Sequence, residues 1–537
     1  MMDFDIIIIG SGAGGGTAAY ALSEKGFRVG LIERGQHFNP KVDYVQNYAD
    51  WENRSNPLEN AMLNEQTIDK SYRSSTIIDG RSQIRSPFNY HRVHGVGGST
   101  LHYQGEAHRF AEHAFASESL FGWGADWPIS YKDLEPYYQQ MEQLLGVAGQ
   151  VGNPFKPERG AFPTPAHPLS QKSQVLAIAA RKVGMTLQNN TLALPSKSVD
   201  GRLPCQLSGG CNYGCVFGAK SSVDQALLAK FKKSSQLSIL TDTQVTRLKY
   251  SESGEVVGVE CSAGNKDRII LSAKVYVLAA GAIETPRLML NSKSDIHLAG
   301  FANEMDQVGR YFMETIVSWL PIQLKGIKQA YLGPPLDSRI WDYCYPADEN
   351  TNGFVLGTDA YLTKDTGPVS HAVSQPGIGR AHKRQVRESF GRKVSLFGIA
   401  EQQPVASNRI TLSKQVDMAG VPKVKIHSLY SQQDHHTVQT MQAKLLAWAD
   451  AAETDNTGQM ANTLWQSEAT HIAGTCRMGN DPMHSVTDQW GQVHNHDNVY
   501  ITDASVMTTQ GAGDSPSLTI QALALRTADK IINDLKR

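Results

Sequence analysis

The sequence lacks the features that mark a chain built to cross a membrane or to bind nucleic acid. No apolar run approaches the roughly 20 residues that a transmembrane helix needs. The 51 basic residues nearly balance the 52 acidic ones, which gives a net charge of -1 without a block of like charges. We therefore expect neither nucleic acid nor an acidic membrane surface as a partner.

The sequence also has few cysteines and no recognisable secretory signal, and both bear on the compartment in which the chain folds. Six cysteines in 537 residues are too few for a disulfide framework. The first expected strand begins within five residues of Met1, which leaves no room for a secretory signal ahead of it. We expect a chain that folds in the cytoplasm. Its length exceeds what one hydrophobic core usually supports, so two domains are predicted.

What is present begins with a strand, a glycine-rich turn and a helix. Residues 5–9 form a run rich in isoleucine, residues 17–24 have helical composition, and residues 27–32 predict a second strand. Glu33 follows directly at the end of that second strand. This order predicts a βαβ unit that binds an ADP-containing dinucleotide, whereas a bare glycine pattern would be weak support.

The glycines between the first strand and the helix each have a distinct expected role. Gly10 permits the tight turn, Gly12 lets the backbone approach a pyrophosphate, and Gly15 lets the helix pack on the strand. The helix amino terminus offers free amides to the phosphates. The Glu33 carboxylate can accept hydrogen bonds from both ribose hydroxyls.

The remainder of the chain predicts an α/β fold with a Rossmann-like cofactor domain and an α+β cap that contains an antiparallel sheet. Residues 36–90 are rich in Asn, Ser and Pro and are expected to be irregular, and a helix is expected from near Tyr131. Further strands are expected over 238–249, 256–261, 274–278 and 499–502, with short strands and helices alternating over 295–467 and a long helix from Ser517. The predicted cofactor domain is discontinuous, comprising residues 1–115, 169–299 and 468–537, and the cap comprises residues 116–168 and 300–467.

Several separate motifs occur in one order along nearly the whole chain. They are Gly10 to Gly15 with Glu33, Gly97-Gly98-Ser99-Thr100, Trp127-Pro128, Gly281 to Pro286, Glu401…Pro404…Asn408-Arg409, His471 to Gly479, and Asp503 with Pro516 to Thr519. Together they resemble the glucose-methanol-choline (GMC) family of flavin oxidoreductases. The resemblance implies FAD as the cofactor and oxidation of an alcohol to a carbonyl compound.

The resemblance places His471 where this family has its active-site histidine. A histidine near its unperturbed pKa of about 6.5 is largely neutral at pH 7 and can accept the hydroxyl proton of the substrate. The imidazolium so formed would also stabilise negative charge on the reduced flavin. The alternative is a structural histidine whose ring bonds to its own loop.

The second active-site position of the family, usually His or Asn, is Ser515 in this chain. A hydroxyl can hold the substrate oxygen, but it cannot act as an effective base near neutral pH. This departure shifts proton transfer onto His471 and leaves Ser515 as a positioning group. It also leaves open a loss of activity, or a neighbour such as Asp514 that supplies the missing contact.

The resemblance also implies a set of cofactor-contacting positions spread over the three segments of the predicted cofactor domain. They are Gly10, Gly12, Ala13, Gly15, Glu33, Arg34, Gly97, Gly98, Ser99, His102, Val245, Ala280, Gly281, Asp503, Pro516 and Thr519. In some relatives the histidine at the place of His102 is covalently attached to the flavin. Its alternative role is to pack against the ring.

Cys205, Cys211 and Cys215 lie within eleven residues of one another on a glycine-rich loop. Three thiolates on such a loop suit an iron–sulfur cluster. The spacing looks like that of bacterial sugar and polyol dehydrogenases of this family that carry a [3Fe-4S] cluster. The alternative is three structural thiols. No Cys-x-x-Cys-His occurs, so electrons that leave through a haem would need a cytochrome on another subunit.

The leading functional hypothesis is an FAD-dependent dehydrogenase that acts on a hydroxyl of a sugar, glycoside or polyol. Trp341, Tyr343, Tyr345 and His371 favour a hydroxylated substrate, although they also suit ordinary packing of the cap. The alternatives are an oxygen-using oxidase of a non-sugar alcohol and an FAD-binding redox subunit that is inactive without a partner. Some relatives are exported together with a small partner subunit, so a periplasmic location is the alternative to the cytoplasm.

Overall fold

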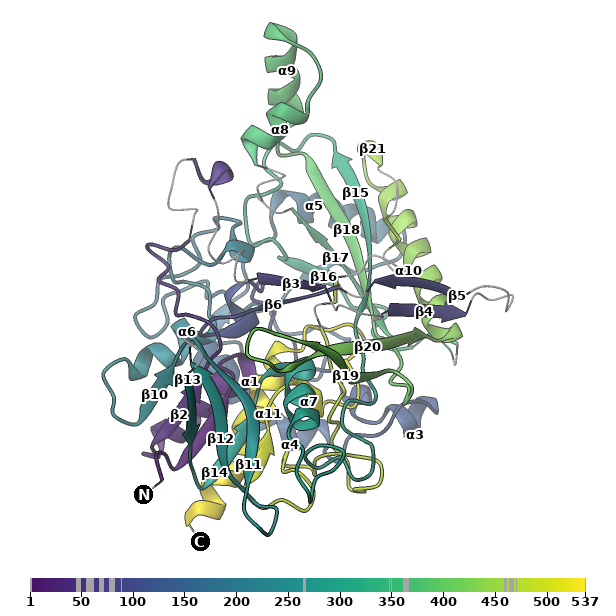
Figure 1. Ribbon diagram of the computed structural model, residues 1–537. Helices are drawn as coiled ribbons and strands as arrows, with labels where there is room; N and C mark the ends of the chain where they lie inside the picture. Colours follow the sequence, from purple (N-terminus) through teal and green to yellow (C-terminus); the bar gives the residue numbers. More distant parts are fainter. Residues whose placement is uncertain are drawn as a thin grey trace.

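The computed structural model describes most of the 537 residues. The described ranges are 2–44, 50–54, 62–66, 72–76, 83–87, 89–263, 267–346, 348, 350–360, 367–457, 461–462, 468–469 and 471–536. A lower body holds both chain termini, and an upper layer is built around a long antiparallel sheet (Figure 1).

A five-stranded parallel sheet forms the centre of the lower body, in the order β10-β2-β1-β14-β24. Its strands are β1 Ile6–Ile9, β2 Val29–Ile32, β10 Leu237–Leu240, β14 Val275–Leu278 and β24 Val499–Ile501. β1, β2, β14 and β24 are buried along their whole length, which explains their mostly aliphatic composition, interrupted only by Gly30, Tyr276 and Tyr500. Segments from the beginning, the middle and the end of the chain therefore pair in one sheet.

Helices cover this sheet and hold the chain ends together. α1 Ala13–Glu24 follows β1 directly, and α11 Ser517–Lys536 packs beside α1 and beside α4 Tyr131–Leu145. α4 begins at a capping box in which the Ser130 hydroxyl and the Asp133 carboxylate each bond the other's backbone amide. α7 Gly281–Asn291 follows β14, and an antiparallel meander packs nearby, consisting of β11 Thr243–Tyr250, β12 Val256–Ala263 and β13 Asp267–Leu271.

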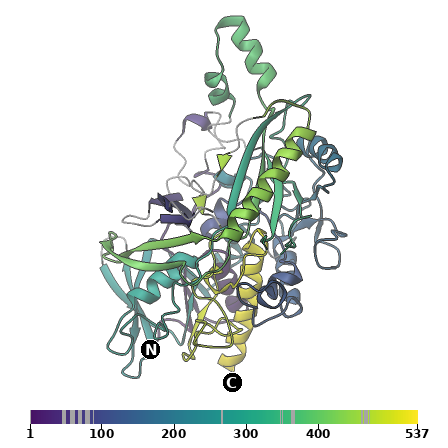
Figure 2. The same cartoon turned by 90° about the vertical axis from the view of Figure 1, so that its right-hand side faces the viewer.

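The upper layer is an antiparallel sheet that runs β21-β15-β18-β17-β16-β9. Its strands are β9 Gln188–Asn189, β15 Ile316–Leu324, β16 Ser338–Ile340, β17 Phe354–Asp359, β18 Lys393–Ala400 and β21 Thr454–Thr457. Burial alternates strictly along β15, and its buried side chains join a core with α10 Gln432–Ala451 and α5 Gln171–Lys182. Helix α10 lies along this sheet in both views (Figures 1 and 2), and the opposite face of the sheet is free to line a site.

The α/β fold with a Rossmann-like sheet and an antiparallel cap sheet is confirmed, and two segments differ from expectation. Residues 36–90 are not irregular throughout, because they contain β3 Met62–Gln66, β4 Tyr72–Thr76, β5 Gln83–Pro87 and the start of β6 Asn89–Val93. β4 pairs with β20 Pro422–Tyr430, which also pairs with β19 Arg409–Val416, and β6 pairs with β3 and β23 Glu468–Ala469. The region 295–467 is dominated by strands of eight or nine residues and one 20-residue helix, not by short alternating elements. The exact boundaries of the two domains stay a prediction.

Two helices between β17 and β18 stand clear of the rest of the molecule (Figures 1 and 2). They are α8 Pro368–Ser374 and α9 Gly379–Ser389, and neither buries a single residue. Within the described ranges no helix combines the length and the apolar character needed to span a bilayer.

Candidate active site

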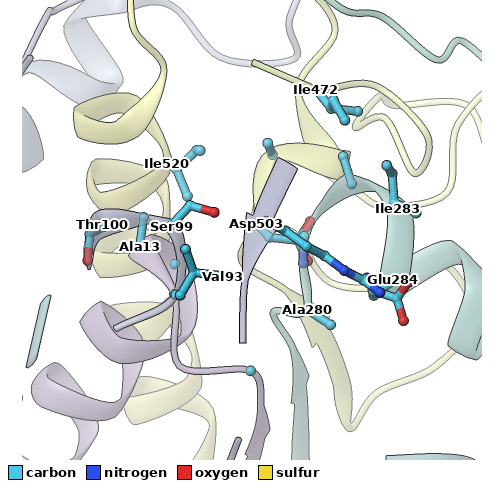
Figure 3. Close-up of a pocket in the computed structure, with 18 of the residues that line it drawn as sticks. Ala13, Val93, Ser99, Thr100, Ala280, Ile283, Glu284, Ile472, Asp503 and Ile520 are labelled. Carbon is cyan, nitrogen blue, oxygen red and sulfur yellow. Dashed lines mark hydrogen bonds and ion pairs between the residues drawn. The ribbon is translucent and has the colours of Figure 1, made fainter. Parts of the chain in front are cut away.

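A cavity of about 670 Å³ lies between the parallel sheet and the cap sheet. Residues from the beginning, the middle and the end of the chain line it, and Figure 3 shows Ala13 and Ser99, Ala280 and Glu284, and Asp503 and Ile520 around it. A volume of this size is within the usual range for cofactor and small-molecule sites. The lower wall comes from the ends of parallel strands and the helices that follow them, where open α/β sheets bind ligands.

The glycine turn after β1 forms one end of this wall. A Cβ atom added at Gly12 would meet no atom within 4 Å, so the space beside this residue is open. Gly98, from the second glycine loop, approaches it so closely that a Cβ there would lie 2.8 Å from the Gly12 Cα. By contrast a Cβ at Gly15 would lie 1.9 Å from the Gly10 carbonyl oxygen, in the packing between α1 and β1. Gly12 and Gly98 thus border the cavity, whereas Gly15 serves the packing of the helix.

Glu33 lies at the end of β2, buried at the cavity wall. One carboxylate oxygen accepts hydrogen bonds from the Ser11 hydroxyl at 2.6 Å and the Ser11 amide at 3.1 Å, and the other accepts from the Gly35 amide at 2.9 Å. Burial nevertheless raises the pKa of Glu33 above its ordinary value. The carboxylate is held rigidly and keeps acceptor capacity on both oxygens.

Asp503 lies on the side of the cavity opposite Glu33, where the carboxyl end of β24 meets the start of α7. Its carboxylate accepts from the Gly281 amide at 2.9 Å, from the Thr285 hydroxyl at 2.5 Å and from the Ser505 amide at 2.8 Å. These bonds tie the carboxyl-terminal loop to the amino terminus of α7. Burial raises the pKa of Asp503.

An ion cluster that sequence reasoning missed lines the same side of the cavity. Glu284 bonds to Arg92 and, at 2.9 Å, to Arg287, and the arginine charges, including that of Arg34, hold its pKa far below the usual range. Arg287 also pairs with Asp417 at 2.8 Å. Of these residues only Arg34 was predicted, as one of the cofactor-contacting positions that the family resemblance implies.

His471 lies at the cap side of the cavity and is half-buried. Its Nδ1 atom is buried and has no hydrogen-bond partner among the described residues, while its backbone oxygen accepts from the Gln510 amide side chain at 2.5 Å. Burial lowers the pKa of His471 to about 4, so the ring is neutral at pH 7. This arrangement is contrary to a structural histidine whose Nδ1 bonds to its own loop.

Ser515 faces the same cavity, and its partner is a residue that the sequence did not reveal. The Ser515 hydroxyl donates to one oxygen of Glu106 at 2.6 Å. The other oxygen of Glu106 accepts from Arg339 at 2.6 and 2.7 Å. Although burial opposes it, the positive charge of Arg339 helps lower the pKa of Glu106 to about 2. Glu106 is therefore an ionised acceptor at neutral pH.

Asp514, which the sequence left open as a neighbour that could supply the contact missing at Ser515, lies outside the cavity lining. Asp514 accepts from the Trp341 indole at 3.0 Å and pairs with Lys156, and it does not line the cavity. Lys156 and His108 hold the pKa of Asp514 well below its usual range. Its carboxylate is thus committed to the packing behind Ser515.

The cap sheet supplies the cavity wall that faces His471 and Ser515. Trp319, Phe397, Gly357 and Arg339 are successive cross-strand partners on β15, β18, β17 and β16. Because Gly357 has no side chain, the Arg339 guanidinium reaches over it and lies 4.3 Å from the centre of the Phe397 ring. Phe397 in turn contacts Trp319, with ring centres 5.1 Å apart. An aromatic and cationic row therefore lines the cavity.

The aromatic residues expected to line a substrate site are elsewhere. Trp341 is buried against Asp514, Tyr343 stacks on Phe354, and Tyr345 is 55% exposed. His371 belongs to the protruding helix α8. None of these four residues lines the cavity, so they give no support to a sugar substrate.

Most of the cofactor-contacting positions implied by the sequence do meet in the cavity. They are Gly10, Gly12, Ala13, Glu33, Arg34, Gly98, Ser99, His102, Val245, Ala280, Gly281, Asp503 and Pro516. Gly15, Gly97 and Thr519 do not line it. Thr519 is instead buried with its hydroxyl 2.7 Å from that of Tyr138, in the contact between α11 and α4.

The three clustered cysteines are not arranged as a metal site. Cys205, Cys211 and Cys215 are free thiols around a void of about 20 Å³, and the described residues contain no group of three that could hold a metal ion. Burial raises the pKa of Cys205 and raises that of Cys211 to about 12, which opposes the thiolate form that metals bind. The prediction of a [3Fe-4S] cluster is therefore not supported, and the reading as structural thiols fits the geometry.

Comparison with known proteins assigns the chain to the same family that the sequence motifs indicated. Two models of the GMC oxidoreductase family match residues 94–312 and 404–524, and a model of an NAD(P)-binding Rossmann-like domain matches residues 8–45. A solved pyridoxine 4-oxidase, described as from Mesorbium loti, shares the fold with a TM-score of 0.64 at 20% identity over 99% of both chains.

Three enzymes of known activity match the chain over nearly its full length. A 2-methyl-1,2-propanediol dehydrogenase of Mycolicibacterium austroafricanum is 29% identical over 98% of this chain and 95% of its own. A 6'''-hydroxyparomomycin C oxidase of Streptomyces lividus is 30% identical over 99% and 92%, and a fructose dehydrogenase large subunit of Gluconobacter japonicus is 26% identical over 99% and 98%. With two family models and a relative at this level of identity in agreement, the chain belongs to the GMC oxidoreductases, a family of FAD-dependent enzymes that act on alcohols.

Proposed function

We propose that this protein oxidises a hydroxyl group of a sugar, glycoside or polyol to a carbonyl, with His471 as the base and with an electron acceptor other than oxygen. The observation that carries the proposal is the neutral imidazole of His471 in the same cavity as Ser515, with a buried Nδ1 that has no partner in the described part of the chain. The acceptor and the identity of the base are the parts that go beyond family membership.

The described residues fit an ADP-containing flavin. The open space beside Gly12, at the amino terminus of α1, suits a pyrophosphate, and the Glu33 carboxylate at the end of β2 suits the ribose hydroxyls. His102 lines the cavity near the second glycine loop. From there its imidazole would either pack against the flavin ring or be covalently attached to it. When bound, FAD supplies the group that accepts a hydride from the substrate carbon.

His471 and Ser515, at the cap side of the cavity, have different roles toward the substrate. His471 is neutral at pH 7 and so can take the hydroxyl proton on its ring. Ser515 has its own proton committed to the ionised Glu106, so its oxygen is left to accept a hydrogen bond from a second hydroxyl of the substrate. Ser515 then orients the substrate through that second hydroxyl, while His471 removes the proton of the reacting hydroxyl as the hydride leaves carbon.

The cap wall and the relatives support a substrate with several hydroxyl groups. Aromatic faces at Trp319 and Phe397, beside the Arg339 guanidinium, offer apolar contact and hydrogen-bond donors together. The names of the three relatives specify 2-methyl-1,2-propanediol, 6'''-hydroxyparomomycin C and fructose. Two of the three are dehydrogenases, which supports a non-oxygen acceptor, and one is a large subunit, which supports a partner subunit and an outgoing path to a cytochrome.

The test is reduction of the bound flavin without oxygen. We expect sugars or polyols to bleach the visible flavin absorbance anaerobically, an artificial dye to reoxidise it, and little peroxide to form in air. Rapid peroxide formation would favour the oxidase, and a panel of alcohols that leaves the flavin oxidised would favour a redox subunit that needs a partner. Acid precipitation of the same sample reports whether the yellow colour stays with the protein, as attachment through His102 requires.

A further inference from the structure

The two helices between β17 and β18 form a projection that the oxidation of an alcohol does not require. This projection, residues 367–392 and here named the basic arm, stands away from the body in both views (Figures 1 and 2). It is an ordered unit, since His371 on α8 bonds to the Ser389 hydroxyl on α9 at 2.8 Å and its ring packs against Phe390. At its base the Glu52 carboxylate accepts hydrogen bonds from the Val369 and Ser370 amides.

Helix α9 concentrates positive charge on one face. Arg380, Lys383, Arg384 and Arg387 are all exposed, and their spacing of three, four and seven residues places them on one side of the helix. None of the four forms an ion pair with a described residue. Glu388 is the single acidic residue in the sequence of the arm. The net charge of the whole protein hides this stripe, because acidic residues elsewhere balance it.

Aliphatic side chains of the same arm are exposed to solvent. Ile378, in the connection that leads into α9, is 90% exposed, and Val373, near the end of α8, is 82% exposed. Val369, one turn before Val373 on α8, is 50% exposed. Such side chains gain nothing where they stand in water and would gain free energy in an apolar medium.

We propose that the basic arm docks this protein on a bilayer that contains anionic lipids. The α9 stripe would lie against the lipid phosphates, and Ile378 and Val373 would enter the region between headgroups and acyl chains. A protein partner is less suited to this surface, because a stable protein interface buries about 800 Å² per partner around a packed apolar centre. The arm consists of two short helices, and it offers three exposed aliphatic side chains instead of such a centre.

Vesicle co-sedimentation of the full-length protein tests the proposal. Vesicles of phosphatidylcholine alone are compared with vesicles that contain about one third phosphatidylglycerol, at low salt and at 1 M salt, where the Debye length falls to about 3 Å. The test variant replaces Arg380, Lys383, Arg384 and Arg387 with Gln. The control replaces four exposed cations of the body, Lys132, Lys182, Lys233 and Lys293, with Gln, which changes the net charge equally. Alcohol oxidation by both variants reports that the body is intact.

We expect wild-type and control protein to bind only the anionic vesicles and to be released by 1 M salt. The arm variant should bind about 100- to 1,000-fold more weakly, since each cation near such a surface contributes roughly a factor of five. Ile378→Ser should weaken the part of vesicle binding that persists at intermediate salt, because that part comes from insertion of the aliphatic side chain. Equal losses in arm and control variants, or no binding of wild-type protein to any vesicle, would overturn the proposal. Arm-dependent capture by immobilised polyglutamate, without vesicle binding, would assign an acidic polypeptide instead.

Discussion

At the scale of single residues, the chemistry of the site is set by which side chains lack partners and which are fully engaged. No described residue bonds to the Nδ1 atom of His471, whereas the Ser515 hydroxyl donates to Glu106 and Glu106 is paired with Arg339. The two polar side chains therefore have different roles. The imidazole can change its protonation state, while the hydroxyl can only hold a proton in place.

Replacing His471 with Ala should lower kcat by about two to four powers of ten, because a positioned general base contributes that much. The bound flavin should remain, since His471 lies at the cap side of the cavity and away from the glycine turn. Stopped-flow reduction of the flavin by substrate measures the effect, and the visible absorbance of the purified variant is its control. A variant that keeps near-normal reduction rates would remove His471 from the mechanism.

The acid side of the pH profile should report the same imidazole. A base must be deprotonated to act, so kcat/KM falls as pH drops through its pKa. Because burial lowers the pKa of His471 to about 4, we expect the acid limb near pH 4 and not near the ordinary value of about 6.5. Measurement of kcat/KM from pH 3.5 to 8 decides this, provided that circular dichroism shows the fold intact. A limb at pH 6.5 would mean that the imidazole is solvated in the working enzyme.

Ser515→Ala should lower kcat/KM by about 10- to 100-fold, the loss expected for one hydrogen bond in a charged network. Ser515→Thr keeps the hydroxyl and should recover part of this loss. Glu106→Gln should act through the same hydroxyl, so the double variant should be less impaired than the sum of the two single effects. Additive losses in this cycle would contradict a positioning role for Glu106.

The sequence could indicate His471 and Ser515 because each lies in a recognisable local motif. Glu106 and Arg339 have no such signal, since they are 233 residues apart and meet only when the cap sheet closes over the cavity. Arg339 also depends on Gly357 lying beside it in the neighbouring strand, a register that one sequence does not reveal. Asp514 was chosen for its nearness in sequence, and its side chain points to Trp341 and Lys156 instead.

At the scale of elements, the glycines at the start of α1 are required for two different reasons, cofactor binding and backbone packing. A side chain at Gly12 would enter the cavity, and a Cβ at Gly14 would lie 1.7 Å from the Thr502 carbonyl oxygen. Both residues line the cavity, yet only at Gly14 would an added Cβ collide with backbone, beside β24. Substitutions there should therefore fail in different ways.

Gly12→Val should abolish flavin binding while the apoprotein stays folded, because Gly12 has φ -68° and a Cβ there meets no protein atom. Gly14→Ala should destabilise the fold itself, since the backbone of Thr502 or of α1 must move. Gly160→Ala, in an exposed loop with no atom near the added Cβ, is the matched control. Flavin absorbance and the thermal midpoint of each apoprotein distinguish the three. Full flavin content in Gly12→Val would place the pyrophosphate elsewhere.

Elements with strong local patterns were predictable, and elements that depend on distant partners were not. The β1–α1–β2 unit follows from its strand composition and glycine turn within 30 residues. β4 and β6 carry no clear local pattern; each pairs with a strand close in sequence, β5 and β3 respectively, and with a strand from far along the chain, β20 and β23. Likewise the four cations of α9 do not form a block in the sequence, and only helical spacing aligns them.

At the scale of the whole molecule, the parallel sheet joins chain segments that are hundreds of residues apart. β1 lies between β2 and β14, and β24 from the last forty residues completes the edge. The cavity walls come from the same three segments and from the cap sheet. A ligand in this cavity thus contacts parts of the chain that have no covalent connection nearby.

This arrangement predicts that FAD stabilises the molecule as one unit. A ligand that binds only the folded state contributes about 2.7 kcal/mol at a concentration 100 times its Kd. Adding FAD to apoprotein should therefore raise the temperature of a single unfolding transition, because both the parallel sheet and the cap sheet lose their shared ligand on unfolding. Differential scanning calorimetry measures the shift, and Gly12→Val should show none at the same FAD concentration. If FAD moved one of two separate transitions and left the other unchanged, the cap would unfold independently of the cofactor, and its residues would not share the cavity as the structure has them.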